Sequence, residues 1–554
     1  MGRWGWVGGI QFGPSGQDWG VRQPGSVGLT CYRPRGPLSE QTLDAPPIEV
    51  SSGPPRGERR PTTSADLKDL AYRYRWVLTA IGLLILSLVI VLYARTRPGY
   101  DPYGWLVWGK LTIHVALDTN GAPSWKPLPY LFTVPYALAG HYALWLWMVT
   151  SVAISLSGLI FAWRIAFRLT YSRPERRYAS YVAGLLAASF VLAMQDPVGN
   201  YNYTHYILSA ESDTMIVSLC LLAIDLHLSG HHKAAFWIWW LGSLGRPEVW
   251  PYYGLAGLWL WWKQPSYRWW LYGSLFALAF LWFGIPGITS KSLLTAGNVA
   301  ENSPREIHGN KITGVITRFH ELLPNTIWVL AVLTVAWAAW RRRITILVLA
   351  GGALLWVLIE IAFALHGFPA VPRYMFEAGA VVGVLAAIFI GRIVHELPAL
   401  LAQLMRRLFG AGVSARLVSQ IGTWGTVLAV VLISGSMLGA AHRQYRLEHT
   451  DLTFERKRTV LIDRLSGVVR TLGAANFFKC GQPNIPIEYQ SVFAWYAGVK
   501  TGILYVSPGY VKAHPHPLVN IYPIAGGGWK VFPSLVNPAH AAACSKMNLI
   551  YHGS

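Results

Sequence analysis

Residues 76–95 read WVLTAIGLLILSLVIVLYAR, an apolar run that contains no acidic residue. A run of this length is what an α-helix needs to cross the hydrocarbon core of a bilayer. Comparable runs recur along the chain and predict about 11 membrane spans, at 76–95, 142–163, 179–195, 206–227, 234–246, 249–262, 269–286, 324–340, 344–365, 377–395 and 422–441. The fifth and sixth are short and separated by Pro247, so a re-entrant hairpin is an alternative for this pair.

The composition agrees with a membrane protein. Hydrophobic residues make up 53% of the 554 residues, charged residues make up 13%, and there are 27 tryptophans. These values lie outside the range of soluble globular proteins. We therefore expect an α-helical polytopic membrane protein with juxtamembrane helices in its first outer loop and a small outer α/β C-terminal domain.

The net charge of +21 does not indicate nucleic-acid binding, because no basic patch interleaved with aromatic residues recurs along the chain. Lys and Arg fall mostly between the apolar runs. With the N-terminus inside, they are about twice as frequent in the predicted cytoplasmic segments as in the predicted outer loops. The positive-inside rule therefore places the N-terminus in the cytoplasm and the loop after residue 95 outside.

The two ends of the chain differ from the membrane region at 71–441. Residues 1–70 are rich in Gly, Pro, Ser and Arg and lack apolar periodicity, which predicts a disordered cytoplasmic arm. Residues 442–554 turn polar, with short β-prone pieces, and predict an extracytoplasmic domain. Cys480 and Cys544 lie in that segment, where a disulfide would persist, whereas Cys220 lies in an apolar run and is expected to be buried.

The first outer loop holds the strongest candidates for chemistry. Asp101 follows the first span, and an ionisable residue at the edge of lipid is a functional-site candidate. A carboxylate there can act as a general base, although Asp101 before Pro102 can also simply cap a helix that carries Trp105 and Trp108. Those two aromatics, and the short apolar run Tyr130 to Ala139, predict interfacial helices on the outer surface.

The same loop closes with Trp125-Lys126-Pro127-Leu128-Pro129. The Lys126 ammonium, at the start of an interfacial helix, can meet an anionic headgroup or a pyrophosphate-like group. A lysine that anchors the helix end by snorkelling is the equally weighted alternative.

A second group of acids begins the fourth span. Glu211 and Asp213 are two residues apart, so they cannot share one face of a helix. We expect one of them to point into a cavity, and Glu211, nearer the outer rim, is the better candidate for a catalytic carboxylate.

Two arginines occur at the same predicted level. Arg246 interrupts an apolar hairpin, where it can pair with Glu248 or bind phosphate oxygens with its planar guanidinium group. Arg373, followed by Tyr374, opens the tenth span and serves either as another cation of the site or as an interfacial anchor.

One span, an outer loop with an early acid, two juxtamembrane helices and a Lys-Pro-x-Pro step together resemble the GT-C superfamily of polytopic glycosyltransferases. The bacterial branch related to protein O-mannosyltransferases and lipid A aminoarabinose transferases is the most similar. Relatives often show Lys-Pro-Pro-Leu where this chain has Lys126-Pro127-Leu128-Pro129. The resemblance covers roughly residues 76–395 and depends on order and topology more than on strict motifs.

The resemblance implies a polyprenyl-phosphate sugar donor and an acid of the first loop, here Asp101, as the base. It implies contacts to the donor phosphate from Lys126, and similar cationic roles for Arg246 and for Arg373 with Tyr374. Some members of that superfamily need a divalent ion and others do not. We expect no cofactor here, and the lack of a clear acidic cluster predicts no obligatory metal.

The predicted function is therefore transfer of a sugar from a polyprenyl-phosphate donor to a cell-envelope acceptor, which is a glycan, a lipid or a protein, on the outer face of the plasma membrane. The alternatives are a transporter or flippase of a lipid-linked or small solute, and a structural membrane subunit. A transporter typically carries its ionisable residues near the midplane, whereas most polar candidates here gather at one face.

Overall fold

The computed structural model describes residues 72–552 except 122, 124, 172–176, 302, 304, 410–413, 507–515 and 535–543. These residues belong to one compact unit, Leu70–Ser554. The predicted arm at 1–70 lies outside the described residues.

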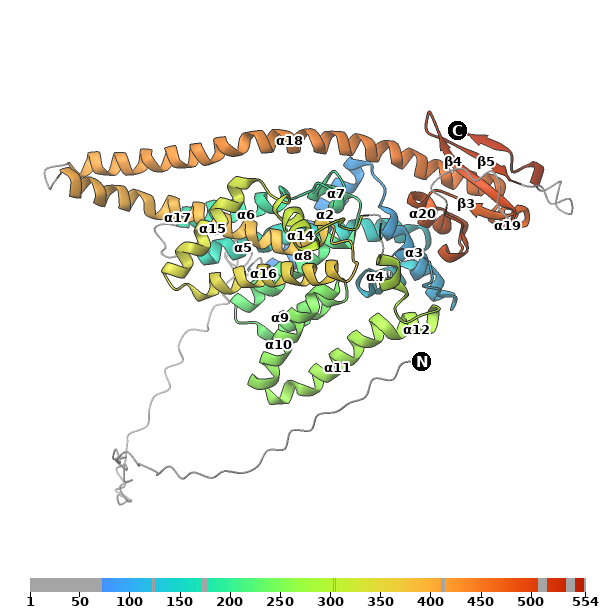
Figure 1. Ribbon diagram of the computed structural model, residues 1–554, viewed down its shortest axis with the longest axis horizontal. Helices are drawn as coiled ribbons and strands as arrows, with labels where there is room; N and C mark the ends of the chain where they lie inside the picture. The colour runs from blue at the N-terminus through green and yellow to red at the C-terminus, as the bar shows by residue number, and fades with distance from the viewer. Residues whose placement is uncertain are drawn as a thin grey trace, which may run out of the picture. The chain divides into compact units, whose positions relative to one another are not determined.

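The described chain is mainly helical, with a small sheet near its C-terminal end (Figure 1). The first helices are α2 (Arg75–Ala94), α3 (Tyr100–Ile113), α4 (Pro127–Ala137), α5 (Ala143–Thr170), α6 (Arg177–Leu192), α7 (Tyr203–Leu208) and α8 (Ser212–Leu228). They are followed by α9 (His232–Ser243), α10 (Trp250–Lys263), α11 (Arg268–Ala279), α12 (Ile285–Thr289), α13 (Thr295–Ala300) and α14 (Lys311–His320). The last are α15 (Asn325–Trp340), α16 (Ile344–Leu365), α17 (Phe376–Phe409), α18 (Ala415–Leu472), α19 (Ala474–Cys480) and α20 (Ile487–Ala497).

Several helices are long and apolar enough to cross a membrane. Among the described residues there are six, or seven if α14 and α15, bent by 99°, form one broken span. The predicted number of about 11 is not confirmed, because the predicted spans at 234–246 and 249–262 correspond to α9 and α10, with 12 and 14 residues. Helices of that length do not reach across the hydrocarbon core by themselves.

Helix α17 is the centre of the helical core, because it contacts α5, α6, α8, α15, α16 and α18. Glycines on α17 allow neighbouring helices to come close. A Cβ at Gly391 would lie 3.1 Å from the backbone oxygen of Ala179 on α6, and one at Gly383 would lie 3.1 Å from Cβ of Phe190. Small residues at helix contacts are how membrane helices gain close packing.

Helix α18 is much longer than the predicted span at 422–441. It is one continuous helix of 58 residues that passes the predicted boundary at 441/442 and ends at the sheet region (Figure 1). The sheet order is β3 (Gln482–Asn484), β4 (Leu518–Ile524), β5 (Gly528–Pro533), β6 (Leu549–Tyr551), with β3 parallel to β4 and the other pairs antiparallel. A separate two-stranded ladder joins β1 (Gln195–Asp196) to β2 (Tyr201–Asn202).

The sheet region also contains the predicted covalent link, because Cys480 and Cys544 form a disulfide. Cys220 is free and buried, as expected.

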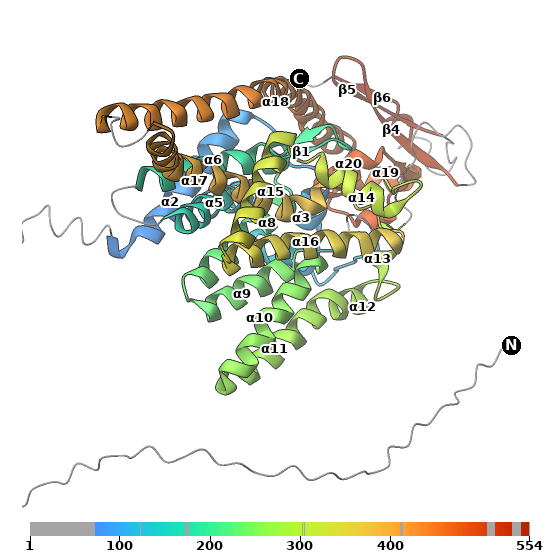
Figure 2. The ribbon, with the colours of Figure 1, turned by 60° about the vertical axis from the view of Figure 1, so that its left-hand side comes forward.

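Figure 2 shows α19 and α20 beside the sheet. Helix α20 packs on α3, where the Tyr100 hydroxyl donates to Oε1 of Gln490 at 2.9 Å, so the sheet region supports the helix that carries Asp101.

The predicted juxtamembrane helices exist as α3 and α4, but the aromatic residues of α3 are not at a surface. Trp105 and Trp108 are both 0% exposed. Trp105 packs edge-on against Trp147 of α5, and Trp108 packs against Trp125. Contacts with α5 and with the loop before α4 cover both indoles, so neither lies on the protein surface as expected. Such contacts come from distant segments and cannot be read from local sequence.

Candidate active site

The N-terminal ends of α3 and α8 meet, and this junction brings the predicted acids together. The Gly99 amide donates to the Ser209 carbonyl oxygen at 2.8 Å. A Cβ at Gly99 would collide with the carboxylate of Glu211, so only a glycine lets the Glu211 side chain lie against the start of α3. Asp101 is in the first turn of α3, and Glu211 is the residue before α8.

Asp101 is a partly exposed acid in a charged setting. Among the described residues it takes part in no hydrogen bond or ion pair, so its carboxylate remains available. Desolvation raises the pKa of the Asp101 carboxyl above its ordinary value of 3.8, while the positive charges of Lys126 and Arg373 act to lower this pKa. A carboxylate with a raised pKa is a better proton acceptor than an ordinary aspartate.

Glu211 and Asp213 both belong to this cluster, which corrects the expectation that they point to different places. Glu211 lies outside the helix, with extended backbone at φ −72° and ψ 152°, so the helical spacing rule does not apply to it. Glu211 is 6% exposed and its Oε2 makes no hydrogen bond among the described residues. Asp213, which is 1% exposed, accepts a hydrogen bond from Arg246.

Lys126 lies at the same helix junction. Its Nζ donates to the Ser212 hydroxyl at 3.1 Å and lies 5.5 Å from the centre of the Trp105 ring. Ser212 is the first residue of α8, and no side chain caps that helix end. An uncapped helix N-terminus beside a lysine is a favourable place for an anion.

Arg246 is neutralised by carboxylates in the structure. Its guanidinium group pairs with Asp213, lies 3.5 Å from Oε1 of Glu248 and 3.9 Å from Oε1 of Glu377, and stands 4.3 Å from the centre of the Tyr374 ring. The side chain is 4% exposed. The internal pair with Glu248, one of the two interpretations left open by the sequence, is present.

The guanidinium group of Arg373 has fewer close carboxylate partners than that of Arg246. Its Nε lies 3.9 Å from Oδ1 of Asp213, beyond hydrogen-bond distance, and makes no hydrogen bond among the described residues. The guanidinium group also lies 5.6 Å from the centre of the Tyr206 ring, and the side chain is 19% exposed. Arg373 therefore has donor capacity to spare at the edge of the cluster.

Sequence reasoning preferred Glu211 to Asp213 and did not consider Glu377, yet Asp213 and Glu377 organise these arginines. Asp213 joins Arg246 to Arg373, and Glu377 lies near Arg246. Glu377 is in the first turn of α17, directly after the short turn Pro372–Met375 that carries Arg373, and an acid beside that motif is the signal that could have identified it.

An apolar cavity of about 690 Å³ extends between α8, α9, α10, α16 and α17. Glu377 lines one part of it, and His227 and Ile344 line another. Its walls include Trp239, Tyr252, Trp356 and Val381. The exposed fraction of Ile344 is 65% and that of Val348 is 66%, so the cavity is open at the helix surface. The apolar cavity therefore adjoins the charged cluster at Glu377, which lies 3.9 Å from Arg246.

No family model matches the chain, and no curated protein matches it. The solved structures that are similar to it include two with bound lipid phosphates. One is ArnT from Cupriavidus metallidurans bound to undecaprenyl phosphate, at 12% identity and a TM-score of 0.43, covering 81% of this chain and 93% of that chain. The other is the archaeal oligosaccharyltransferase AglB from Archaeoglobus fulgidus in complex with an inhibitory peptide and a dolichol phosphate, at 11% identity and a TM-score of 0.39, covering 77% of this chain and 64% of that chain.

At these TM-scores we assign neither a family nor a residue role from the likeness. The described part of the chain is largely helical, with several apolar helices long enough to cross a membrane and a small sheet region.

Proposed function

We propose that the protein is a multi-pass glycosyltransferase of the plasma membrane, which moves a sugar from a polyprenyl-phosphate donor to a cell-envelope acceptor on the outer face. The observation that carries the proposal is the grouping of an available carboxylate, Asp101, with the cations Lys126 and Arg373 at an uncapped helix end. A base and an anion site at one place are what transfer from a phosphate leaving group requires.

Asp101 removes the proton from the acceptor hydroxyl as that oxygen attacks the anomeric carbon of the sugar. The bond between that carbon and the donor phosphate breaks, and the electron pair leaves with the phosphate. Lys126, Arg373 and the N-terminus of α8 stabilise the charge that develops on the phosphate. Attack in line, without a covalent intermediate, inverts the configuration of the anomeric carbon.

The remaining predicted residues have indirect roles in this proposal. Arg246 holds Asp213, which faces Arg373, and the Tyr374 ring lies over Arg246. In this geometry Lys126 and Arg373 are better placed than Arg246 to contact phosphate. Glu211 lies against Gly99 at the start of α3, where its carboxylate adds negative charge near Asp101. The apolar cavity next to the cluster suits the hydrocarbon chain of the donor.

The test is an Asp101→Asn variant supplied with a panel of radiolabelled polyprenyl-phosphate monosaccharides in membranes. Loss of a general base typically lowers the rate by about 10²- to 10⁴-fold, and we expect a loss in that range with binding of undecaprenyl phosphate retained. Asp118→Asn is the matched control, because Asp118 is an acid of the same loop that pairs with Lys500 at 3.4 Å and is outside the cluster.

Sugar transfer by Asp101→Asn at the wild-type rate would remove the catalytic role. Movement of a lipid-linked sugar across the bilayer without transfer to any acceptor would favour the flippase alternative instead.

A further inference from the structure

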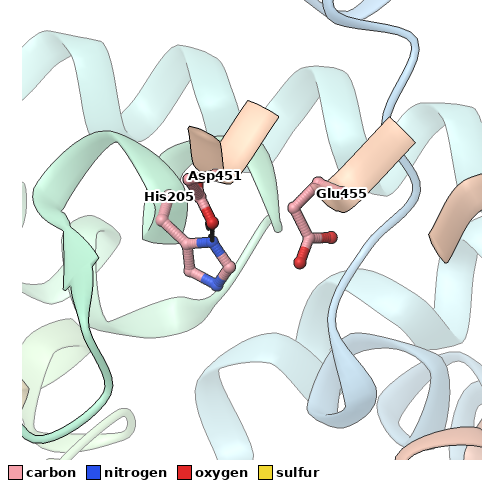
Figure 3. Close-up of side chains that lie close together, drawn as sticks. All are labelled: His205, Asp451 and Glu455. Atoms are coloured by element: carbon pink, nitrogen blue, oxygen red, sulfur yellow. Dashed lines mark hydrogen bonds and ion pairs between the residues drawn. The ribbon is translucent and has the colours of Figure 1, made fainter. Parts of the chain in front are cut away.

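A second group of metal-ligating side chains lies between α7 and α18, apart from the residues assigned to the reaction. His205 comes from α7, and Asp451 and Glu455 come from α18 (Figure 3). One nitrogen of His205 and one oxygen from each carboxylate lie within 4.8 Å of one another. These three residue types are those that bind zinc and related dications.

The histidine is held in place on two sides. Its Nδ1 lies 3.0 Å from both carboxylate oxygens of Asp451, and its ring stacks on Tyr201 with centroids 3.8 Å apart. Asp451 and Tyr201 together therefore fix the orientation of the imidazole ring between α7 and α18.

Glu455 has one carboxylate oxygen left for a further ligand. The residue is 6% exposed, its Oε2 accepts a hydrogen bond from Arg458 at 2.8 Å, and its Oε1 accepts none among the described residues. Figure 3 shows the Glu455 carboxylate beside the imidazole of His205. An ionised carboxylate oxygen with free lone pairs can bind a cation.

Three carboxylates come together on the side of α18 that faces α7. Glu448, Asp451 and Glu455 are spaced by three and four residues, which places three carboxylates on one face of α18. Glu448 accepts from the Thr204 hydroxyl, which is neutral, and Arg458 pairs with Glu455. Like charges at this spacing destabilise a helix unless a positive charge offsets them.

We infer that His205, Asp451 and Glu455 bind a divalent transition-metal ion such as Zn²⁺. Two metal bonds of about 2.1 Å span roughly 4 Å, so side-chain rotations bring the three ligand atoms onto one ion. The ion ties α18, which leads to the sheet region, to α7, which leads directly to Glu211. Its role is to position the site, because Asp101 and the phosphate-binding candidates are not among its ligands.

The experiment uses the full chain purified in detergent and treated with EDTA. ZnCl₂ is titrated by calorimetry, and CoCl₂ is titrated by visible absorption, which reports the coordination of the ion. We expect wild type to bind one more ion than the Glu455→Gln variant, or to bind it at least about tenfold more tightly. Zn²⁺ should raise the melting temperature of wild type and not that of the variant.

His449→Gln is the matched control, because His449 is an exposed histidine of the same helix, and its Zn²⁺ binding should equal that of wild type. Asp451→Asn, at a position with a side chain 11% exposed, is the second ligand variant and serves if Glu455→Gln does not fold. Equal Zn²⁺ stoichiometry and affinity in wild type and in the folded ligand variants would overturn the inference, as would a wild type that binds neither ion. These readouts measure binding and not sugar transfer, so the result is independent of the proposed function.

Discussion

Asp101 and Lys126 illustrate how a membrane-edge acid can be prepared for proton transfer. Desolvation raises the pKa of the Asp101 carboxyl, and the Lys126 charge moderates that rise. The net effect is a carboxyl whose pKa lies above its ordinary value, so that its ionised form is a stronger base than an ordinary aspartate.

The pH dependence of transfer follows from this balance. Because the base works when deprotonated, kcat/KM should fall as the pH drops through the raised pKa of Asp101, at a pH above its ordinary value of 3.8. Lys126→Ala removes a charge that lowers this pKa, so the acid limb of the profile should move to higher pH. The measurement is kcat/KM against pH for both proteins.

Lys110→Ala is the control for that profile. Lys110 is on α3, the helix that carries Asp101, but its ammonium lies 5.7 Å from the centre of the Trp495 ring. An acid limb that stays in place in Lys126→Ala, or moves to lower pH, would contradict the assignment of Asp101 as the base.

At the scale of elements, the meeting of α3 and α8 builds the site. The backbone of Gly99 approaches the carboxylate of Glu211 so closely that a side chain would displace it. Gly99 has φ −66° and ψ −173°, which alanine adopts freely, so the close approach and not the backbone conformation requires glycine.

Gly99→Ala is therefore expected to reduce activity more than stability. The end of the Glu211 side chain can move, which keeps the fold but displaces a carboxylate beside Asp101. A displacement of about 1 Å can lower a rate by up to roughly 10²-fold. Transfer rate and melting temperature, measured together, check this.

Gly82→Ala on α2 is the comparison, because a Cβ there meets no atom within 4 Å and should leave both quantities unchanged. Unchanged transfer by Gly99→Ala would show that the position of Glu211 does not matter for the reaction.

At the scale of the whole molecule, the sidedness of the site is the central question. The Cys480–Cys544 disulfide supports an outer location for the sheet region, because disulfides persist outside the cytoplasm. Since α20 of this region packs on α3, the site and the disulfide belong to the same end of the helical region.

Introduced cysteines test that orientation after the other two cysteines of the sequence are replaced, as Cys31→Ser and Cys220→Ser, which leaves only the disulfide-bonded Cys480 and Cys544. A membrane-impermeant maleimide should label Lys530→Cys, exposed on β5, in intact cells. It should label Arg342→Cys, exposed between α15 and α16, after the cells are permeabilised. The reverse pattern would place the site in the cytoplasm and remove the proposed outer-face reaction.

The sequence by itself determined that this is a membrane protein with apolar helices, which of its cysteines can pair, and that Asp101, Lys126, Glu211, Arg246 and Arg373 are the residues to examine. These conclusions depend on hydrophobicity, spacing and the cost of charge near lipid, which are properties of local sequence. Only the tertiary structure decided that Asp213 joins Arg246 to Arg373 and that His205 meets Asp451. It also decided that Glu211 lies outside the helix, where helical spacing does not apply, and that Trp105 and Trp108 are buried. Each of these depends on contacts between segments far apart in the chain, and helical periodicity carries no information about which neighbour covers a given face.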